Sequence, residues 1–568
     1  MSLTSTLSIG RTALTASQLG LQVAGNNLAN ATTPGYTRQS LLTSPAGGQR
    51  FGQGIAGLGV QVEGIRREIN ESVQARLRLG IADEQAARAR LEMFSAVEAT
   101  LGEFTGSSVT SELDSFFNSF SELANLVGSE SLVIQEAATL AGQLSATRSR
   151  LLDQQNQIDD EIGASITRAN AILTDLATVN AAIIGAESGL GQDGNLRDQR
   201  DQLLSDLSEL MDVTVTELPG GGVDVLVGST PVLLGGQSLG LDLETEVING
   251  QIEITVALAQ TGRDLNITGG RIGGLIDARE RALGDTIDSL DAIAGQLIRQ
   301  VNELQVTGAS ENGLTLAQGT LALAIADQTV PLSDPSLASV LPWSVSNGNF
   351  SIRVTNPTTL EEQLVPIEVD LDGLNGDDTT AAAIVAQLDA IDGITASFAA
   401  DGTLRVEAAA GWEFGFEDDS SGFLAAFGVN SFFTGTNASD IAVNENLEAN
   451  PSLLRVGRMV DGELVSNGTA LAIADLANLD IEALGDQTMI ERWSASTQAV
   501  GNRTNAAITE TEAAELVRQS LEAERAALSG VSTDEESINL IEFQTAYEAA
   551  ARLISITDEL LDTLLSLV

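Results

Sequence analysis

The chain has 568 residues and a hydrophobic content of 43%, which is enough for several domains with buried cores. It contains no cysteine and no histidine, which excludes disulfides, zinc fingers, thiol nucleophiles, Ser-His-Asp triads and histidine-ligated metals. The formal charge of −51 argues against a nucleic-acid partner, because an acidic surface repels phosphates. Any enzyme of this composition would have to work with carboxylates, arginines and hydroxyl groups.

The acidity is uneven along the chain. Residues 1–80 hold seven arginines and only three glutamates, so they form a basic segment in an acidic protein. No segment carries the roughly 20 apolar residues that span a bilayer, and the N-terminus lacks the pattern of a cleavable signal peptide. We expect no membrane insertion, and export, if it occurs, must proceed without signal cleavage.

The two ends of the chain carry apolar residues at a spacing of seven. Such a repeat is typical of helices that wind around one another, so we expect the ends to pack together or to pack into an assembly. Residues 3–30 and the last helix of the chain carry these repeats. The positions are Leu7, Leu14, Leu21 and Leu28 near the N-terminus, and Leu540, Tyr547, Ile554, Leu561 and Val568 near the C-terminus.

The first of these helices is expected to be weak in isolation. Gly10, Gly20 and Gly25 each cost about 1 kcal/mol of helix propensity, so the helix should depend on packing partners. Pro34 and Gly35 end it with a turn. In a monomer we expect limited proteolysis to trim both ends first.

The region after this turn is expected to be extended and then helical. Residues 52–57 match the dinucleotide pattern G-x-G-x-x-G, but no apolar strand precedes them and no helix opens at the third glycine, so a glycine-rich turn is the better interpretation. Residues 84–185 are expected to be helical, with an aromatic cluster on a shorter helix and core stripes at a spacing of seven. These positions are Phe116, Phe117 and Phe120, then Leu144, Leu151 and Ile158, then Ile162, Ala169, Leu176 and Ile183.

A charged stretch and a β region follow. Residues 194–201 hold dense opposite charges, which we interpret as the ion-paired start of a helix rather than as acid–base chemistry. From residue 212 the apolar period changes to two, and a turn at 219–222 predicts a β-hairpin. A helix returns with leucines at a spacing of seven: Leu283, Leu290, Leu297 and Leu304.

Residues 308–490 are expected to form one or two acidic, β-rich outer domains. We expect short strands such as 350–354 and 365–369, and one short helix at 379–388 between strands. Asp370 and Asp372 begin a stretch similar to a calcium loop, but the fifth and twelfth positions lack oxygen ligands, so whether an ion binds there stays open. A carboxylate-dependent hydrolase or a secreted adhesin would have to be located in these domains.

The chain ends in helices. Ala507, Ala514, Leu521 and Leu528 form one seam, and Gly530 interrupts it. We expect Thr533 to cap the final helix, with Glu536 reaching back in a capping box.

Several stretches resemble the bacterial flagellar rod, hook and junction axial proteins. The N-terminal signature of that family is similar to residues 24–39, and stretches of its hook–filament junction members are similar to residues 194–201 and 428–435. The C-terminus of the junction members resembles residues 529–552, with Phe543 where the family usually has tyrosine. A hook or distal-rod protein is the alternative, and the junction-type C-terminus argues against it.

The resemblance implies a structural protein that assembles at the distal end of the hook and joins hook to filament. For such a protein we expect no enzyme activity, no catalytic residue, no cofactor and no metal site. It implies a homo-oligomeric ring between hook protein and the next junction protein, hook-associated protein 3. It also implies type III export to the extracellular flagellum without a cleaved signal, and an export chaperone on the C-terminal helix. We expect the assembly interface to comprise Leu7, Leu14, Leu21, Leu28, Asn26, Asn27, Asn30, Pro34, Gly35, Tyr36, Leu540, Phe543, Tyr547, Ile554, Leu561 and Leu564.

The expected fold is multidomain α+β. A terminal helical coiled coil and a long helical bundle form an inner core, and β-rich domains are inserted as outer parts. The predicted segments are an assembly helix with an extended part (1–80), a helical bundle (81–210), an inserted β-hairpin region (211–268), a bundle helix (269–307), the outer domains (308–490), and a C-terminal bundle with the terminal assembly helix (491–568).

Overall fold

The computed structural model describes residues 3–51, 54–102, 108–126, 128–188, 191–248, 251–374 and 376–566. The chain divides into two compact units, and each unit is assembled from separated stretches of sequence. The first unit holds Met1–Met93, Gln157–Arg279 and Thr504–Val568; the second holds Phe94–Asn156 and Glu280–Arg503. Both ends of the chain therefore belong to one unit, and the α+β architecture agrees with the sequence-based expectation. The six sequence segments proposed above stay a prediction.

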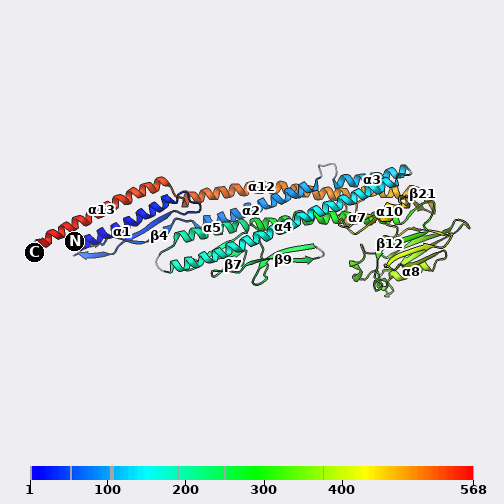
Figure 1. Ribbon diagram of the computed structural model, residues 1–568, viewed down its shortest axis with the longest axis horizontal. Helices are drawn as coiled ribbons and strands as arrows, with labels where there is room; N and C mark the ends of the chain where they lie inside the picture. The colour runs from blue at the N-terminus through cyan, green and yellow to red at the C-terminus, as the bar shows by residue number, and fades with distance from the viewer. Residues whose placement is uncertain are drawn as a thin grey trace. The chain divides into compact units, whose positions relative to one another are not determined.

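The first unit contains the two terminal helices, which lie side by side (Figure 1). A β-ribbon formed by β1 and β4 packs along the first of these helices, and the shorter strands β2 and β3 extend the ribbon. The elements are α1 (Leu3–Ala29), β1 (Gln39–Pro45), β2 (Gly48–Phe51), β3 (Gly54–Gly57), β4 (Val60–Arg67) and α13 (Thr533–Ser566). The predicted extended segment after the first helix is thus confirmed.

Residues 54–57 of the glycine-rich stretch form a strand rather than a nucleotide loop. Strand β3 begins at Gly54 and pairs with β2, so a strand stands where a dinucleotide site requires a helix. Residues 52 and 53 lie outside the described part of the chain, as does Val568, the last position of the predicted C-terminal repeat.

Three long helices contribute one part of their length to each unit. They are α2 (Glu71–Leu101), α4 (Glu130–Glu187) and α12 (Met489–Ser529). By length and composition, α4 is the one helix among the described residues that could cross a bilayer. The core stripes predicted on it at a spacing of seven are nevertheless buried within the protein, each with 2% or less of its surface exposed: Leu144, Leu151, Ile158, Ile162, Ala169, Leu176 and Ile183.

The β region of the first unit begins with the predicted hairpin. Val215 pairs with Val225 across the turn at 219–222, and a four-stranded antiparallel sheet forms in the order β5-β6-β7-β8, followed by a separate two-stranded ribbon of β9 and β10. The helices α5 (Gly194–Leu210) and α6 (Gly270–Ala278) bracket this region. The strands are β5 (Thr214–Glu217), β6 (Val223–Val227), β7 (Thr230–Leu234), β8 (Gln237–Ser238), β9 (Leu241–Ile248) and β10 (Gln251–Leu258).

The second unit has a helical part centred on phenylalanine side chains. Phe116 of α3 (Val109–Asn125) contacts Phe117, Phe120, Phe432 and Phe433 at ring-centroid distances of 5.2, 5.2, 6.1 and 5.6 Å. These rings are buried, so the predicted aromatic cluster is confirmed as core.

A π-helical turn, Arg279–Gly284, leads into α7 (Asp285–Val306). The leucines predicted here at a spacing of seven are Leu283, Leu290 and Leu297, which are fully buried, and Leu304, which is half-buried.

The β-rich part of the second unit contains, among the described residues, three three-stranded sheets, ordered β14-β13-β17, β12-β16-β15 and β11-β20-β21. The first two enclose one hydrophobic core. The strands and short helix predicted between 350 and 389 are confirmed as β13, β14 and α8. Remaining elements are β11 (Gly308–Ala309), β12 (Leu316–Ala322), β13 (Gly348–Asn356), β14 (Glu361–Val369), α8 (Ala381–Asp389), β15 (Ile394–Phe398), β16 (Thr403–Ala408), β17 (Glu413–Glu417), α9 (Phe423–Ala426), β18 (Phe433–Thr434), β19 (Ala442–Val443), α10 (Glu445–Ala449), β20 (Gly457–Val460), β21 (Glu463–Val465) and α11 (Gly468–Asp475).

Candidate assembly site

Small residues of α1 form its contact with α13. A Cβ atom added to Gly10 would lie 2.8 Å from the Ile554 side chain, and one added to Gly20 would lie 2.5 Å from the Phe543 ring. Both glycines are buried, so a larger residue at either position would push the helices apart. Two of the three glycines that weaken an isolated helix, Gly10 and Gly20, therefore allow α13 to approach closely, whereas Gly25 has no neighbour within 4 Å.

The buried face of α1 is not the predicted leucine seam. It consists of Ser5, Gly10, Ala16, Ser17, Gly20, Val23, Ala24 and Asn27. The two ends do pack together as expected, but close approach selects the side of α1 with the smallest residues. The leucine seam is left accessible: Leu7, Leu14 and Leu21 are half-buried, and Leu28 is 38% exposed.

On α13, some of the predicted positions face α1 and others remain accessible. Phe543 and Ile554 turn toward α1 and are half-buried against its glycines. Leu540 and Leu561 are also half-buried, whereas Tyr547 and Leu564 are 37% and 52% exposed. Whether the accessible residues contact neighbouring molecules stays a prediction.

Asn27 connects the end of α1 to the following loop, to β1 and to α13. Its Nδ2 donates hydrogen bonds to the Gln39 carbonyl at 2.8 Å and to the Glu536 carboxylate at 3.0 Å. Its Oδ1 accepts from the Tyr36 hydroxyl at 2.8 Å and from the Gln39 backbone N–H at 3.0 Å. Because Asn27 is completely buried and all its donors and acceptors are used, its side chain fixes these segments in one arrangement.

The predicted capping box at the start of α13 is wrong. The helix begins at Thr533, and the backbone N–H of Glu536 donates to the Ser532 carbonyl at 3.0 Å. Ser532 Oγ accepts from the Glu535 N–H at 3.4 Å, so Ser532 rather than Thr533 stands at the cap. The Glu536 side chain is buried and binds Asn27 and Arg38 instead, and the bond from Arg38 joins two opposite charges.

Arg38 joins the loop to the C-terminal helices. Its Nε donates to Glu536 and its Nη1 to Glu535, each at 2.9 Å, and its backbone N–H donates to the Ser529 carbonyl at 3.0 Å. We refer to Asn27, Tyr36, Arg38, Gln39 and Glu536 as the terminal clasp. The clasp ties residues 27–39 to the start of the last helix, some 500 positions away in sequence.

The remaining residues of the N-terminal signature shape the loop. Gly35 has a φ of +81°, a left-handed conformation that favours glycine, while Pro34, Asn26 and Asn30 lie at or near the surface. Burial, together with the negative charges of Asp198 and Glu536, raises the pKa of Tyr36 to about 12. The phenol therefore stays protonated and continues to donate to Asn27 at physiological pH.

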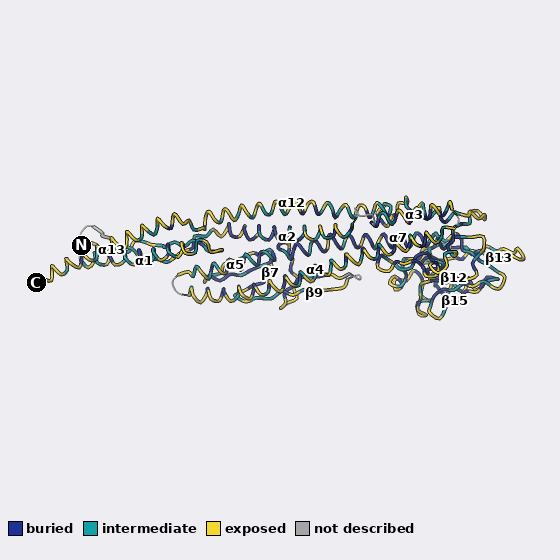
Figure 2. Tube along the Cα trace, turned by 45° about the horizontal axis from the view of Figure 1, so that its top comes forward, coloured by how far each residue is buried: buried dark blue, intermediate teal, exposed yellow. Residues whose placement is uncertain are grey.

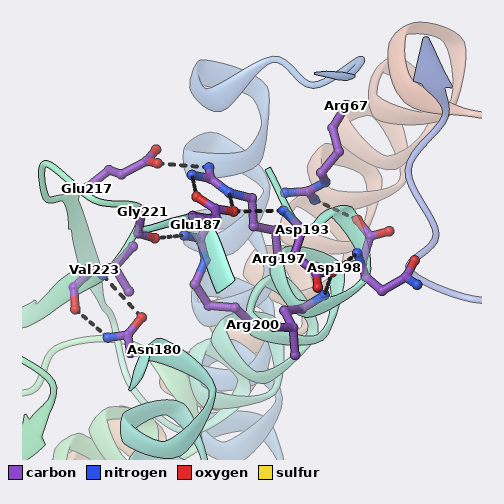
Figure 3. A network of polar contacts seen from close by, with 12 residues as sticks. Arg67, Asn180, Glu187, Asp193, Arg197, Asp198, Arg200, Glu217, Gly221 and Val223 are labelled. Carbon is purple, nitrogen blue, oxygen red and sulfur yellow. Dashed lines mark hydrogen bonds and ion pairs between the residues drawn. The ribbon is translucent and has the colours of Figure 1, made fainter. Parts of the chain in front are cut away.

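Arg67 links the β-ribbon to α5. Its Nη2 lies 2.7 Å from Asp198 and 2.6 Å from Asp201, and its side chain is 4% exposed (Figure 3). Asp198 also accepts from the backbone N–H of Thr37 at 3.3 Å, so it supports the loop of the terminal clasp. Burial raises the pKa of Asp198, and the Arg67 guanidinium opposes this effect.

Next to this pair, Arg197 holds two carboxylates. Its Nε and Nη2 donate to Glu187, each at 2.8 Å, and its Nη1 donates to Glu217 at 2.8 Å (Figure 3). Hydrogen bonding to Arg197 holds the pKa of Glu187 below its ordinary value, against the opposing effect of burial. The predicted ion-paired helix start is thus confirmed. The pair Arg200–Asp201 lies within α5, whereas Glu187, Glu217 and Arg67 come from other elements.

The polar groups of this site hold neighbouring segments of the protein together. Its carboxylates are held by arginines, Asn27 and backbone N–H groups. Across the described ranges, no group of three or more His, Cys, Asp and Glu side chains is arranged to hold a metal ion. In the loop similar to a calcium site, Asp370 and Asp372 accept backbone N–H bonds from residues two positions later, at 3.3 and 2.7 Å.

Comparisons with known proteins identify the group to which the chain belongs. Family models match residues 94–319 (Flagellar hook-associated protein FlgK helical domain), 7–37 (Flagella basal body rod protein) and 525–567 (Flagellar basal body rod FlgEFG protein C-terminal). Flagellar hook-associated protein 1 of Escherichia coli (strain K12) is 24% identical, with 98% of each chain covered. The corresponding protein of Bacillus subtilis (strain 168) is 27% identical over 99% of this chain and 97% of its own.

The chain belongs to the flagellar hook-associated protein 1 family. The models that match its two ends are shared with rod proteins, so the helical middle is what separates it from them. It is a hook–filament junction protein, a structural and non-enzymatic component of the extracellular axial part of the bacterial flagellum. The fold agrees with this family: the flagellar hook junction protein FlgK from Burkholderia pseudomallei has a TM-score of 0.51 and 15% identity, covering 80% of this chain and 100% of that one.

Several residues of the site were not predicted from the sequence. They are Thr37, Arg38, Gln39, Arg67, Asp198, Asp201, Ser532 and Glu535, and Glu536 was assigned the wrong role. One signal could have found Arg38 and Arg67: they belong to the basic N-terminal segment of an otherwise acidic chain, where carboxylate partners from elsewhere are to be expected.

Proposed function

We propose that the α1–α13 pair is the part of this junction protein that packs into the axial structure, and that many copies form a ring there. Hook protein would contact the ring on one side, and hook-associated protein 3 would contact it on the other. The observation that carries the proposal is the terminal clasp, since it holds both end helices as one rigid pair while their outer apolar residues stay accessible.

The exposed apolar residues of the pair support this role. Ile541, Leu564 and Leu565 of α13 are 64%, 52% and 73% exposed, and the leucine seam of α1 is only half-buried. Apolar surface of this kind is stabilised by about 25 cal/mol per Å² when a neighbour covers it. Figure 2 shows α13 exposed along much of its length, in contrast to the buried inner helices.

The exposed apolar surface of the α1–α13 pair would have to be covered before assembly. We infer that an export chaperone binds the C-terminal helix in the cytoplasm and that the chain is exported through the flagellar type III apparatus without signal cleavage. The glycines of α1 favour this route, because a helix of low intrinsic stability unfolds at little cost and refolds against its partner.

The experiment replaces Leu14 and Leu21 by Asp in the full chain. Two charges on the accessible seam should leave a folded, exported protein but give cells whose hooks carry no filaments, counted by electron microscopy. The matched control, Leu14→Met with Leu21→Met, keeps the seam apolar and should give normal filaments. Normal filament numbers in the Asp variant would refute the assembly role of this surface.

A further inference from the structure

Two adjacent cavities lie inside the first unit, next to the loop of residues 33–37. The outer cavity has a volume of about 280 Å³ and lies between this loop and residues 522–530 at the end of α12. The inner cavity has a volume of about 10 Å³, enough for one water molecule, and is bordered by α2 and α5. Gly35 and Arg525 line both cavities, so the two are neighbours.

Arg78 of α2 lines the inner cavity and is a buried cation without a partner. The residue is 8% exposed, and its Nε is enclosed without a hydrogen bond. Among the described residues, no carboxylate lies within ion-pair distance of its guanidinium. Burial lowers the pKa of Arg78, and the negative charges of Asp201 and Glu71 oppose this effect only in part. Because an unpaired charge is costly to bury, this position favours an anion as its partner.

The other charged side chains of the two cavities leave this positive charge uncompensated. Arg525 of α12 is half-buried and, in the described part of the chain, also has no ion pair. The two carboxylates that line the cavities are already held by other arginines. Asp201 lies 2.6 Å from Arg67 and 3.0 Å from Arg200, and Glu522 lies 2.7 Å from the arginine four positions earlier. Two guanidinium groups therefore border the cavities without a counter-ion.

Two neutral side chains add hydrogen-bond donors to the same space. Gln74 lines the inner cavity and is 8% exposed, and Ser529 lines the outer cavity and is 5% exposed. Across the described ranges, neither side chain forms a hydrogen bond within the protein. An amide, a hydroxyl and two guanidinium groups can all donate to the oxygen atoms of one anion.

We propose that the two cavities bind one small divalent oxyanion of the phosphate or sulfate class. The outer cavity is large enough for the anion, which contacts Arg525 and Ser529 directly. One water molecule in the inner cavity carries its hydrogen bonds to Arg78 and Gln74. The bound anion joins the loop of the terminal clasp to the end of α12. This binding does not depend on the assembly role proposed above.

The alternative is that water alone fills both cavities and that the two arginines complement the negative C-terminal end of the α12 dipole. The two accounts differ in what Arg78 does. With water alone, Arg78→Gln has the same effect on stability in chloride and in phosphate. With a bound anion, the substitution removes an uncompensated charge in chloride but removes a partner of the anion in phosphate.

The test titrates phosphate into the full chain at constant ionic strength, with chloride as the replaced anion. Binding is followed by isothermal titration calorimetry and by amide hydrogen exchange, and we expect one saturable site. At a phosphate concentration about ten times Kd, the amides of residues 33–38 and 522–530 should exchange about tenfold more slowly. Sulfate should compete with phosphate for the site, and chloride should not.

Arg525→Gln should weaken phosphate binding at least about tenfold, because a charge-assisted hydrogen bond is lost. Arg78→Gln should weaken it by a similar factor, yet leave the stability in chloride equal or higher. Arg66→Gln is the matched control, since Arg66 pairs with Glu68 at the surface and lines neither cavity, so its phosphate affinity should equal that of the original protein. Absence of saturable phosphate binding, or unchanged affinity in either Arg525→Gln or Arg78→Gln, would overturn the inference.

Discussion

Asn27→Ala is the substitution that most directly probes the terminal clasp. It removes four hydrogen bonds, two donated to Gln39 and Glu536 and two accepted from Tyr36 and Gln39. Each bond contributes about 1 kcal/mol net, and the substitution also leaves the buried Glu536 carboxylate and the Gln39 backbone partly unsatisfied. Together these effects should lower the free energy of opening of the terminal helices by roughly 3–5 kcal/mol. That loss applies to the α1–α13 pair and not to the second unit.

Native-state hydrogen exchange on the full chain measures this loss. Amides of α1 and of the first turns of α13 should exchange roughly 100-fold faster or more, since each 1.4 kcal/mol is a factor of ten, while amides of α7 keep their protection. Asn26→Ala is the matched control in the same motif, because Asn26 is exposed and its side chain makes two exposed hydrogen bonds. Its Nδ2 donates to the Tyr36 hydroxyl at 3.2 Å, and its Oδ1 accepts from Asn30 Nδ2 at 3.0 Å. Equal effects of the two substitutions, or no change at α13 in Asn27→Ala, would refute the reasoning.

Three further predictions concern the first unit. Gly20→Leu should separate the terminal helices and raise their amide exchange rates, because even a Cβ there would lie 2.5 Å from the Phe543 ring. In Gly25→Ala the added Cβ meets no atom within 4 Å, so the free energy of opening of α1 should rise by up to about 1 kcal/mol and its amides should exchange more slowly. Arg67→Gln should lower the free energy of unfolding of the first unit by about 3 kcal/mol, since Asp198 loses its arginine and Asp201 keeps only its pair with Arg200. Arg66→Gln breaks the exposed pair with Glu68 and should cost less than about 1 kcal/mol in the same denaturation measurement. Glu187 has a folded pKa below its ordinary value of 4.5. Its ion pair with Arg197 therefore stabilises the protein above pH 4.5, and this contribution is lost as the pH falls through the folded pKa. The difference in free energy of unfolding between the original protein and Glu187→Gln should shrink below about pH 4.5. A constant difference from pH 7 to pH 3 would contradict that assignment.

The helical elements were predictable because their buried stripes are long and regular. The stripe from Leu144 to Ile183 repeats at seven and is buried throughout, so periodicity alone identifies its face. On α1 the same rule selected the leucines, and the structure instead buries glycine, alanine and serine. Periodicity records which residues are apolar, whereas close approach between two helices depends on which residues are small.

The clasp itself could not be derived from local patterns. Thr533 and Glu536 fit a capping box, and only the presence of Asn27 and Arg38 beside them diverts the carboxylate. Those partners are some 500 positions away, and their proximity depends on both end helices packing together first. Resemblance to the axial protein family marked Asn27 and Tyr36 as residues of the site, but it gave no information on what they bind.

A density map of the assembled hook–filament junction tests the central claim most directly. We expect the pair α1–α13 to line the assembly with the Asn27–Glu536 contact intact. The leucine seam of α1 and the exposed residues Ile541, Leu564 and Leu565 of α13 should be covered by neighbouring copies. A map in which these residues face solvent, and copies meet only through residues 308–490, would contradict the assembly role of the terminal pair.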